Sequence, residues 1–212
     1  LTRDQAQKLT GKALSFSTFP ECEISVNSSE HAFIRFALNE GTSSGFTVQQ
    51  SMSISSLRDA QSASPRVDEC DDDSLREAVK RTARLAAIAP PNPERVPPLE
   101  KQKYQELENY AASTASARHQ AMIPHIRAII DGAGKNSLVA AGFFERSAET
   151  AAIANKQGKF GSGRVTDANL SATVRNASGT SSGWASQPAV LMHSPDVPPV
   201  AILSAEPVPC PC

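Results

Sequence analysis

The sequence predicts an α+β fold of two layers, in which helices pack on antiparallel or mixed sheets. One supporting observation is a strand–turn–strand pattern at residues 37–45, which read Ala-Leu-Asn-Glu-Gly-Thr-Ser-Ser-Gly. A similar order of a small apolar residue, an Asn, a Gly-containing turn and a Ser-Gly pair recurs at residues 154–163. Asn and Gly tolerate positive φ, so each copy predicts a hairpin turn. Because a helical pattern precedes the strands in both places, we expect two related helix-plus-antiparallel-strand halves.

Length and composition allow one ordinary domain or two small ones, since the chain has 212 residues. The net charge of −1 offers no general attraction for nucleic acid or an anionic membrane, and we expect neither as a partner. No run of 18 apolar residues is present. The four cysteines (Cys22, Cys70, Cys210 and Cys212) do not resemble a disulfide framework, which favours a reducing, cytoplasmic location.

The first half is expected over residues 1–89, as a helix, four strands and a second helix. Thr2 and Gln5 fit a capping box, and the helix that they begin should end before Pro20. Ser74 to Glu77 form a second possible capping box after the acidic residues 71–73, which suit a helix N-terminus. The expected strands are residues 21–27, 31–38, 46–56 and, more weakly, 62–70.

Five prolines between residues 90 and 98 predict an extended linker over residues 90–112. The second half is expected over 113–186, with a helix that begins after Ser113 or Thr114. Pro124 should kink or restart that helix, at a cost of about 3 kcal/mol if nothing relieves it. The expected strands are 138–145 and 148–155, which should form a hairpin, and then 160–167 and 170–175, with 183–185 beginning or closing a further element. Residues 187–212 are rich in proline and almost uncharged, so they predict a disordered tail.

Several short motifs resemble, in the expected order, the amino-terminal region of TldD/PmbA-family proteins over roughly residues 1–186. They are Glu21-Cys22-Glu23-Ile24-Ser25-Val26, Arg35-Phe36-Ala37-x-Asn39, Asp73-x-Leu75-Arg76-x-x-Val79, Ala89-Pro90-x-Asn92-Pro93-Glu94, Ala140-Ala141-Gly142-Phe143, Ala152-x-Ala154-Asn155-x-x-Gly158 and Ser182-Gly183-Trp184-Ala185. The resemblance implies an intracellular metallopeptidase, or the partner subunit of one, that cuts small or unfolded peptides. It also implies a peptide substrate and a homologous partner subunit, in a homodimer or a heterodimer.

In that family zinc sits on a His-Glu-x-x-x-His helix in a later part of the chain, where two histidines share one face and the Glu activates water. None of the four histidines here (His31, His119, His125 and His193) is followed by Glu. We therefore expect the amino-terminal, non-catalytic part of a zinc metallopeptidase. No residue of this chain is assigned a catalytic or metal-binding role, no substrate-binding residue is assigned, and the zinc is expected only in the full-length family member.

The proline-rich tail departs from the family pattern, which should continue into another helix. We interpret this as a truncation or a change of reading frame near Ser186, with a natural short form as the alternative. A different class of function is also open, namely a stand-alone binding or assembly module without enzymatic activity.

Other candidate sites have ordinary structural explanations. Residues 41–45 and 179–183 both match Gly-x-Ser-x-Gly, the pattern of a serine-hydrolase nucleophile elbow, but Gly and Ser are also common in turns. The acidic group of Glu69 and residues 71–73 is more typical of a solvated helix cap than of a cation site. Cys22 alternates with apolar residues and is expected in the core. Residues 158–164 are Gly-rich but lack the Lys-Ser/Thr pair and the following helix of a phosphate-binding loop.

His119 and His125 are six residues apart and so do not share a helical face as an i, i+4 pair would. We expect them to be surface or capping residues. Cys210 and Cys212 in the tail offer two sulfur ligands, which make a weak metal site on their own.

Overall fold

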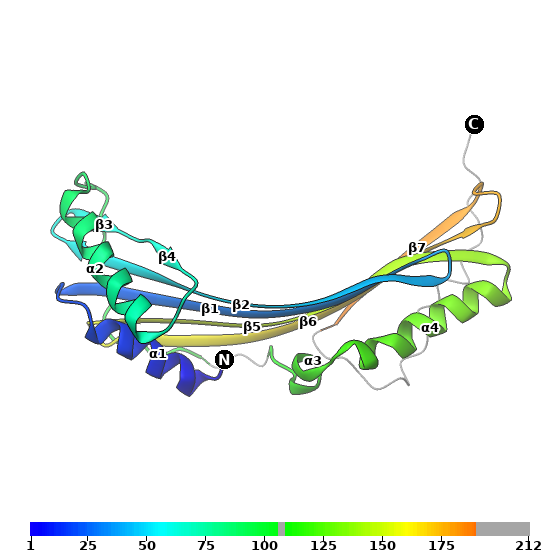
Figure 1. Ribbon diagram of the computed structural model, residues 1–212, viewed down its shortest axis with the longest axis horizontal. Helices are drawn as coiled ribbons and strands as arrows, with labels where there is room; N and C mark the ends of the chain where they lie inside the picture. The colour runs from blue at the N-terminus through cyan, green and yellow to red at the C-terminus, as the bar shows by residue number, and fades with distance from the viewer. Residues whose placement is uncertain (106–108, 190–212) are drawn as a thin grey trace. The chain divides into compact units, whose positions relative to one another are not determined.

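The computed structural model describes residues 1–105 and 109–189 as four helices and seven strands (Figure 1). The elements are α1 (Arg3–Ser15), β1 (Glu21–Ala37), β2 (Glu40–Arg58), β3 (Gln61–Ala63), β4 (Arg66–Val67), α2 (Asp72–Ile88), α3 (Ala112–Ser116), α4 (His119–Lys135), β5 (Leu138–Asn155), β6 (Phe160–Asn176) and β7 (Ser182–Ala189). The strand order is β3-β2-β1-β5-β6-β7, with β4 also paired to β2. This arrangement confirms the α+β prediction.

Three of the strands each join two segments that the sequence pattern predicts as separate strands. The segments expected at 21–27 and 31–38 join into β1, and those at 160–167 and 170–175 join into β6. The segments at 138–145 and 148–155 also form one strand, β5, so the hairpin expected between them is wrong. Polar stretches such as residues 28–30 look like breaks because they interrupt the apolar alternation. Backbone ladder hydrogen bonds do not need apolar side chains, so the strand continues through them.

A hairpin turn forms within each of the two segments 37–45 and 154–163, and an Asn stabilises each one, although the first turn is confined to residues 38 and 39 and β2 begins at Glu40. In the β1–β2 turn, Leu38 and Asn39 have φ of 53° and 60°, as a two-residue hairpin loop requires. The Asn39 side chain also donates to the Leu138 carbonyl (3.0 Å) and accepts from the Ala140 N–H (2.7 Å), which anchors the turn to β5. In the β5–β6 turn, the Asn155 side chain accepts from the N–H groups of residues 157 and 159.

The first compact unit consists, among the described residues, of Leu1–Ser29, residues 48–105 and Glu149–Arg164. Its core joins one face of the strands to α1 and α2, which lie beside β1 and β2 in Figure 1. The fully buried members are Ala6, Ala13, Cys22, Ile24, Val26, Met52, Ile54 and Leu75. The Thr2–Gln5 capping box is confirmed. The box expected at Ser74 is wrong, because Asp71 caps α2 by accepting from the N–H groups of Asp73 and Ser74.

The second compact unit consists, among the described residues, of Glu30–Thr47, Asn109–Ala148 and residues 165–189. Its core places α4 against one face of the strands. The buried members are Ala32, Ile34, Phe36, Met122, Ile126, Ile129, Ala133, Ala140, Phe144, Ala168, Ala172 and Val174. The restart expected at Pro124 is wrong, because α4 continues through it. Pro124 lies near the helix start, and the buried face formed by Met122, Ile126 and Ile129 holds the helix on both sides of it.

Strand β7 corrects the expected start of the tail. It runs to Ala189 and pairs with β6, so residues 187–189 are part of a strand. Pro188 is tolerated because β7 is the last strand in the order, and an edge strand does not need every N–H in the ladder. Residues 190–212, which include His193, Cys210 and Cys212, lie outside the described residues. The division at residues 89, 112 and 186 stays a prediction.

Within the described part of the chain, every helix is too short or too polar to span a bilayer.

Candidate functional site

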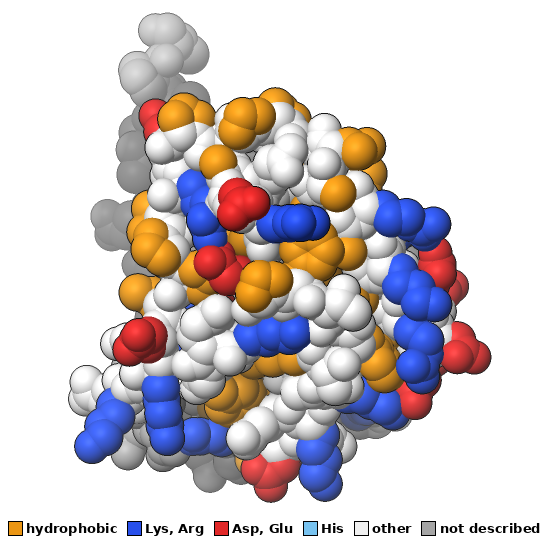
Figure 2. Space-filling view, turned by 90° about the vertical axis from the view of Figure 1, so that its left-hand side faces the viewer, with side chains coloured by type: hydrophobic (Ala, Val, Ile, Leu, Met, Phe, Trp, Pro, Cys, Tyr) orange, Lys and Arg blue, Asp and Glu red, His pale blue; other side chains and the backbone are white. Residues whose placement is uncertain are grey.

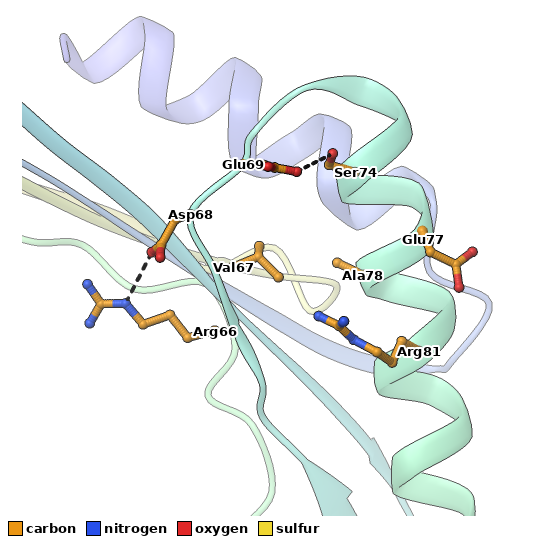
Figure 3. A pocket seen from close by; sticks show the side chains of 8 residues that line it. All are labelled: Arg66, Val67, Asp68, Glu69, Ser74, Glu77, Ala78 and Arg81. Atoms are coloured by element: carbon orange, nitrogen blue, oxygen red, sulfur yellow. Dashed lines mark hydrogen bonds and ion pairs between the residues drawn. The ribbon is translucent and has the colours of Figure 1, made fainter.

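A cavity of about 470 Å³ lies between strand β4 and the first part of helix α2, and we call it the edge groove (Figure 3). Its lining residues are Arg66, Val67, Asp68, Glu69, Ser74, Glu77, Ala78 and Arg81. Helix α2 begins here because Asp71 caps it, and Ala78 is buried against the core of the first unit. Val67 points toward α2 and packs against that same core. The walls of the groove are thus held by the local cap and by core packing.

Strand β4 leaves one backbone edge free of any partner strand in the described chain. It pairs only with β2, in antiparallel register, with Met52 opposite Val67 and Ser53 opposite Arg66. The Ile54 N–H donates to the Pro65 carbonyl (3.1 Å), so residues 65 and 67 direct their backbone groups toward β2. In an antiparallel ladder the alternate residues then direct theirs the other way. The N–H and C=O groups of Arg66 and Asp68 therefore face away from β2.

Most charged side chains of the edge groove have partners. Glu77 binds Arg84 (2.6 Å), Arg66 lies 3.8 Å from Asp68, and Ser74 donates a hydrogen bond to Glu69 (3.1 Å). In Figure 3 Glu77 points away from β4, and Arg81 points toward it. No hydrogen bond or ion pair of Arg81 is found with any described residue. Its guanidinium is therefore the cation in this groove that remains available for a ligand.

A second cavity of about 460 Å³ lies on the other face of the first unit's strands. Ser25 and Asn27 line it and alternate with the buried Ile24 and Val26. The remaining lining residues are Tyr104, Gln105, Ala151, Ala152, Ile153, Gly161, Ser162 and Gly163. The ring of Tyr104 lies so close to Gly161 that an added Cβ would be 3.0 Å from the ring. The floor of this cavity is made of small residues beside one half-exposed aromatic ring.

In the second unit, an aromatic and charged cluster occupies the strand face opposite α4. Phe33 and Phe143 stack with ring centroids 5.6 Å apart, and the Arg35 guanidinium lies 5.3 Å from the Phe143 centroid. His31 Nε2 lies 3.0 Å from Glu145 Oε2. Each of these side chains has neighbours that explain its position, so the cluster resembles a structural network more than a reaction centre.

The other described histidines have ordinary partners. His119 is the first residue of α4, and its Nε2 lies 3.0 Å from the Gly45 carbonyl oxygen. His125 stands edge-on to Phe144, with ring centroids 5.7 Å apart, and burial lowers its pKa. Among the described residues, no three His, Cys, Asp or Glu side chains come together as a metal site would require. The absence of zinc from the isolated chain remains a prediction.

The other candidate residues from the sequence also have structural roles. Cys22 is buried, as predicted, and burial raises the pKa of its thiol. Residues 41–45 lie within strand β2, so the interpretation of this copy as a turn is wrong, although no helix follows it as an elbow would need. Residues 179–181 lie in the turn between β6 and β7, as predicted, whereas Ser182 and Gly183 begin β7. The Asp71 carboxylate caps α2, and hydrogen bonds from Ser74 lower its pKa.

Sequence reasoning missed Arg66 and Arg81. Arg81 lies three residues after the buried Ala78 and two after the buried Val79, at the border of the apolar stripe of α2. That position is a weak signal, because the sequence does not show which strand a helix border will face.

Solved structures with the same arrangement of elements were found by comparison. TldE from Thermococcus kodakarensis matches with a TM-score of 0.71 and 21% identity, over 87% of this chain and 42% of that one. The chain has a TldD/PmbA-like fold. Putative modulators of DNA gyrase from Thermotoga maritima and Bacteroides thetaiotaomicron match with TM-scores of 0.74 and 0.69 and identities of 15% and 16%. They align with 92% and 88% of this chain, and with 45% and 44% of their own.

The expected resemblance to TldD/PmbA proteins is thus confirmed at the level of the fold. The chain spans less than half the length of each of these matched structures. No family model and no curated protein matches the sequence.

Proposed function

We propose that this chain is the amino-terminal, non-catalytic part of a TldD/PmbA-like metallopeptidase, and that it holds an extended peptide at the β4 edge. The observation that carries the first part is the fold match to TldE, which covers most of this chain but 42% of TldE. The remainder of such a protein would supply the zinc and the catalytic groups.

Exposed apolar side chains support a role within a larger assembly. On α2 and the segment after it, Ile88, Val96 and Leu99 are exposed by 80%, 75% and 57%. Figure 2 shows apolar side chains lying among charged ones on the face that it presents. Contact sites for another protein part are typically apolar, so we propose residues 88–99 as the place where the remainder of the protein packs.

The free edge of β4 supports peptide binding. A peptide that adds as a strand uses backbone hydrogen bonds, so it is bound without strict sequence requirements. That property suits a protein that handles small or unfolded peptides. The edge groove beside β4 also gives room for the side chains of such a peptide.

Hydrogen exchange tests the peptide-binding part. Saturation of the full chain with an unstructured peptide should slow exchange of the Arg66 and Asp68 amides, because these face the free edge. The Val67 amide faces β2 and serves as the internal control, with little further protection expected. Equal protection at all three amides, or none at any, would count against strand addition at β4.

Activity and metal measurements test the non-catalytic part. We expect the 212-residue chain to cleave no peptide and to hold no stoichiometric zinc. Metal analysis that finds one tightly bound zinc per chain would contradict this. Reading the gene beyond Ser186 in all three frames is the complementary test, because a His-Glu-x-x-x-His segment in any frame would identify the missing catalytic part. A recognisable continuation without that motif would indicate an inactive partner subunit.

A stand-alone binding module is the second candidate, and the two buried cores favour it because each unit is packed on its own. This candidate predicts no continuation of the family pattern in any frame, together with a chain that stays monodisperse at high concentration.

A further inference from the structure

We infer that the edge groove selects extended peptides carrying a carboxylate, which Arg81 binds. This inference rests on the proposed peptide-binding function and adds the class of peptide. The groove combines a free strand edge, a cavity of about 470 Å³ and a guanidinium that points toward the strand (Figure 3).

The charges around the groove decide whether it attracts an anionic or a cationic ligand group. Three carboxylates line it, but two of them are matched with cations: Glu77 with Arg84 at 2.6 Å, and Asp68 with Arg66 at 3.8 Å. Glu77 also points away from β4 (Figure 3). Of the two lining arginines, Arg81 has no such match among the described residues. A ligand group that approaches Arg81 therefore meets a cation that is not already neutralised.

Glu69 is the carboxylate of the groove without a matched cation. It lies too far from Arg81 to neutralise the charge of that guanidinium. It accepts a hydrogen bond from Ser74, at the start of α2. Arg81 comes seven residues after Ser74, which corresponds to roughly 10 Å along a helix. Charges at that separation in water are largely screened at physiological ionic strength. The Arg81 end of the groove should therefore attract an anion.

A carboxylate is the group that fits both the Arg81 guanidinium and a peptide bound along β4. Guanidinium groups bind carboxylates through paired N–H donors, and peptides carry carboxylates on Asp and Glu side chains and at the chain end. A peptide strand beside β4 would place alternate side chains on the α2 side, where Arg81 lies. The groove thus combines backbone binding, which tolerates many sequences, with one charge preference.

Matched peptides test this preference on the full chain. The probes are acetylated and amidated nine-residue peptides of Thr, Val and Ser with a central Glu, Gln or Lys, measured by fluorescence anisotropy. The Glu peptide should bind roughly threefold to fivefold more tightly than the Gln peptide at low salt, the range of an exposed ion pair. The Lys peptide should bind most weakly. The Glu–Gln difference should vanish in about 0.5 M salt.

Two variants on the same helix separate Arg81 from its surroundings. Arg81→Gln should make the Glu and Gln peptides bind equally while leaving the affinity for the Gln peptide unchanged. Lys80→Gln is the matched control, because it removes one positive charge from an exposed position of the same helix that does not line the groove, and it should preserve the difference. Circular dichroism would check that both variants fold like the parent chain.

The outcomes distinguish this inference from the function on which it rests. Equal binding of the Glu and Gln peptides by the parent chain would overturn the carboxylate preference and leave peptide binding intact. Equal weakening of both peptides by Arg81→Gln would also overturn it, because Arg81 would then support the groove rather than bind the carboxylate. Failure of every peptide to bind would overturn the proposed function together with the inference.

Discussion

At the scale of single residues, Arg146 of β5 stabilises the fold mainly by filling buried volume. Its side chain is fully buried, and its Nε donates to the Ala117 carbonyl (3.0 Å). Its Nη2 lies 3.6 Å from Glu30 Oε2, an ion-pair distance, and neither terminal nitrogen has a hydrogen-bond partner among the described residues. Burial lowers the pKa of Arg146, although the nearby Glu30 opposes that effect. The position therefore depends more on filled volume than on charge.

A pair of substitutions at Arg146 tests this. Arg146→Met keeps most of the volume, so the free energy of unfolding should stay within about 1 kcal/mol of the parent value. Arg146→Ala leaves a cavity and should lower it by about 2–4 kcal/mol. Glu30 is 38% exposed on its side chain, so water can solvate it in either variant. Urea unfolding measures both, and equal losses for Met and Ala would contradict the volume argument.

At the scale of elements, strand β5 requires a glycine at position 142, where it lies beside β6. A Cβ added at Gly142 of β5 would collide with the Ser171 carbonyl oxygen of β6 and with the buried ring of Phe36. A Cβ at Gly163 of β6 would meet nothing within 4 Å. The two glycines are thus required to different degrees, although both lie in strands.

The matched substitutions Gly142→Ala and Gly163→Ala make this difference measurable. Gly142→Ala should lower the free energy of unfolding by about 2–3 kcal/mol, because the backbone or the Phe36 ring must move. Gly163→Ala should be neutral or raise it by up to about 0.5 kcal/mol, since alanine restricts the unfolded chain more than glycine does. Thermal unfolding of both proteins gives the comparison, and a Gly142→Ala protein as stable as the parent would show that the strands can separate there.

At the scale of the whole molecule, the chain builds two cores from segments that are far apart in sequence. Each compact unit combines three stretches of chain, and strands β1, β2, β5 and β6 contribute residues to both units. The net charge of −1 means that no large excess of one charge opposes folding at neutral pH. The pH dependence of stability should therefore reflect individual groups, among which His125 is one whose pKa is lowered.

Stability should fall as the solution is acidified below about pH 6.5, and His125 should cause part of the fall. Burial lowers the pKa of His125 in the folded chain below its ordinary value of 6.5. The unfolded chain therefore takes up a proton at a pH where folded His125 remains neutral, and acid favours unfolding. Urea unfolding of the parent and of His125→Gln between about pH 7 and pH 5 measures the effect. An unchanged slope in the variant would exclude His125 as the cause.

The sequence by itself determined the features that depend on neighbouring residues. Thr2 and Gln5 specify the first helix cap, because the hydrogen bonds of that cap join residues close in the chain. Asn39 favours a turn at its own position, because Asn tolerates positive φ. The alternation around Ile24 gives the buried face of β1 in the same way. The family resemblance came from short motifs of this kind, and the fold comparison confirmed its architecture.

Only the tertiary structure decided how distant segments meet. The polar residues 28–30 were expected to separate two strands, yet pairing with neighbouring strands carries β1 through them. The edge groove also exists only because α2 packs beside β4, which brings Arg81 toward Val67 and the free edge of that strand. Local propensity reaches a few residues along the chain, whereas strand pairing and helix packing are fixed by contacts between residues far apart in sequence.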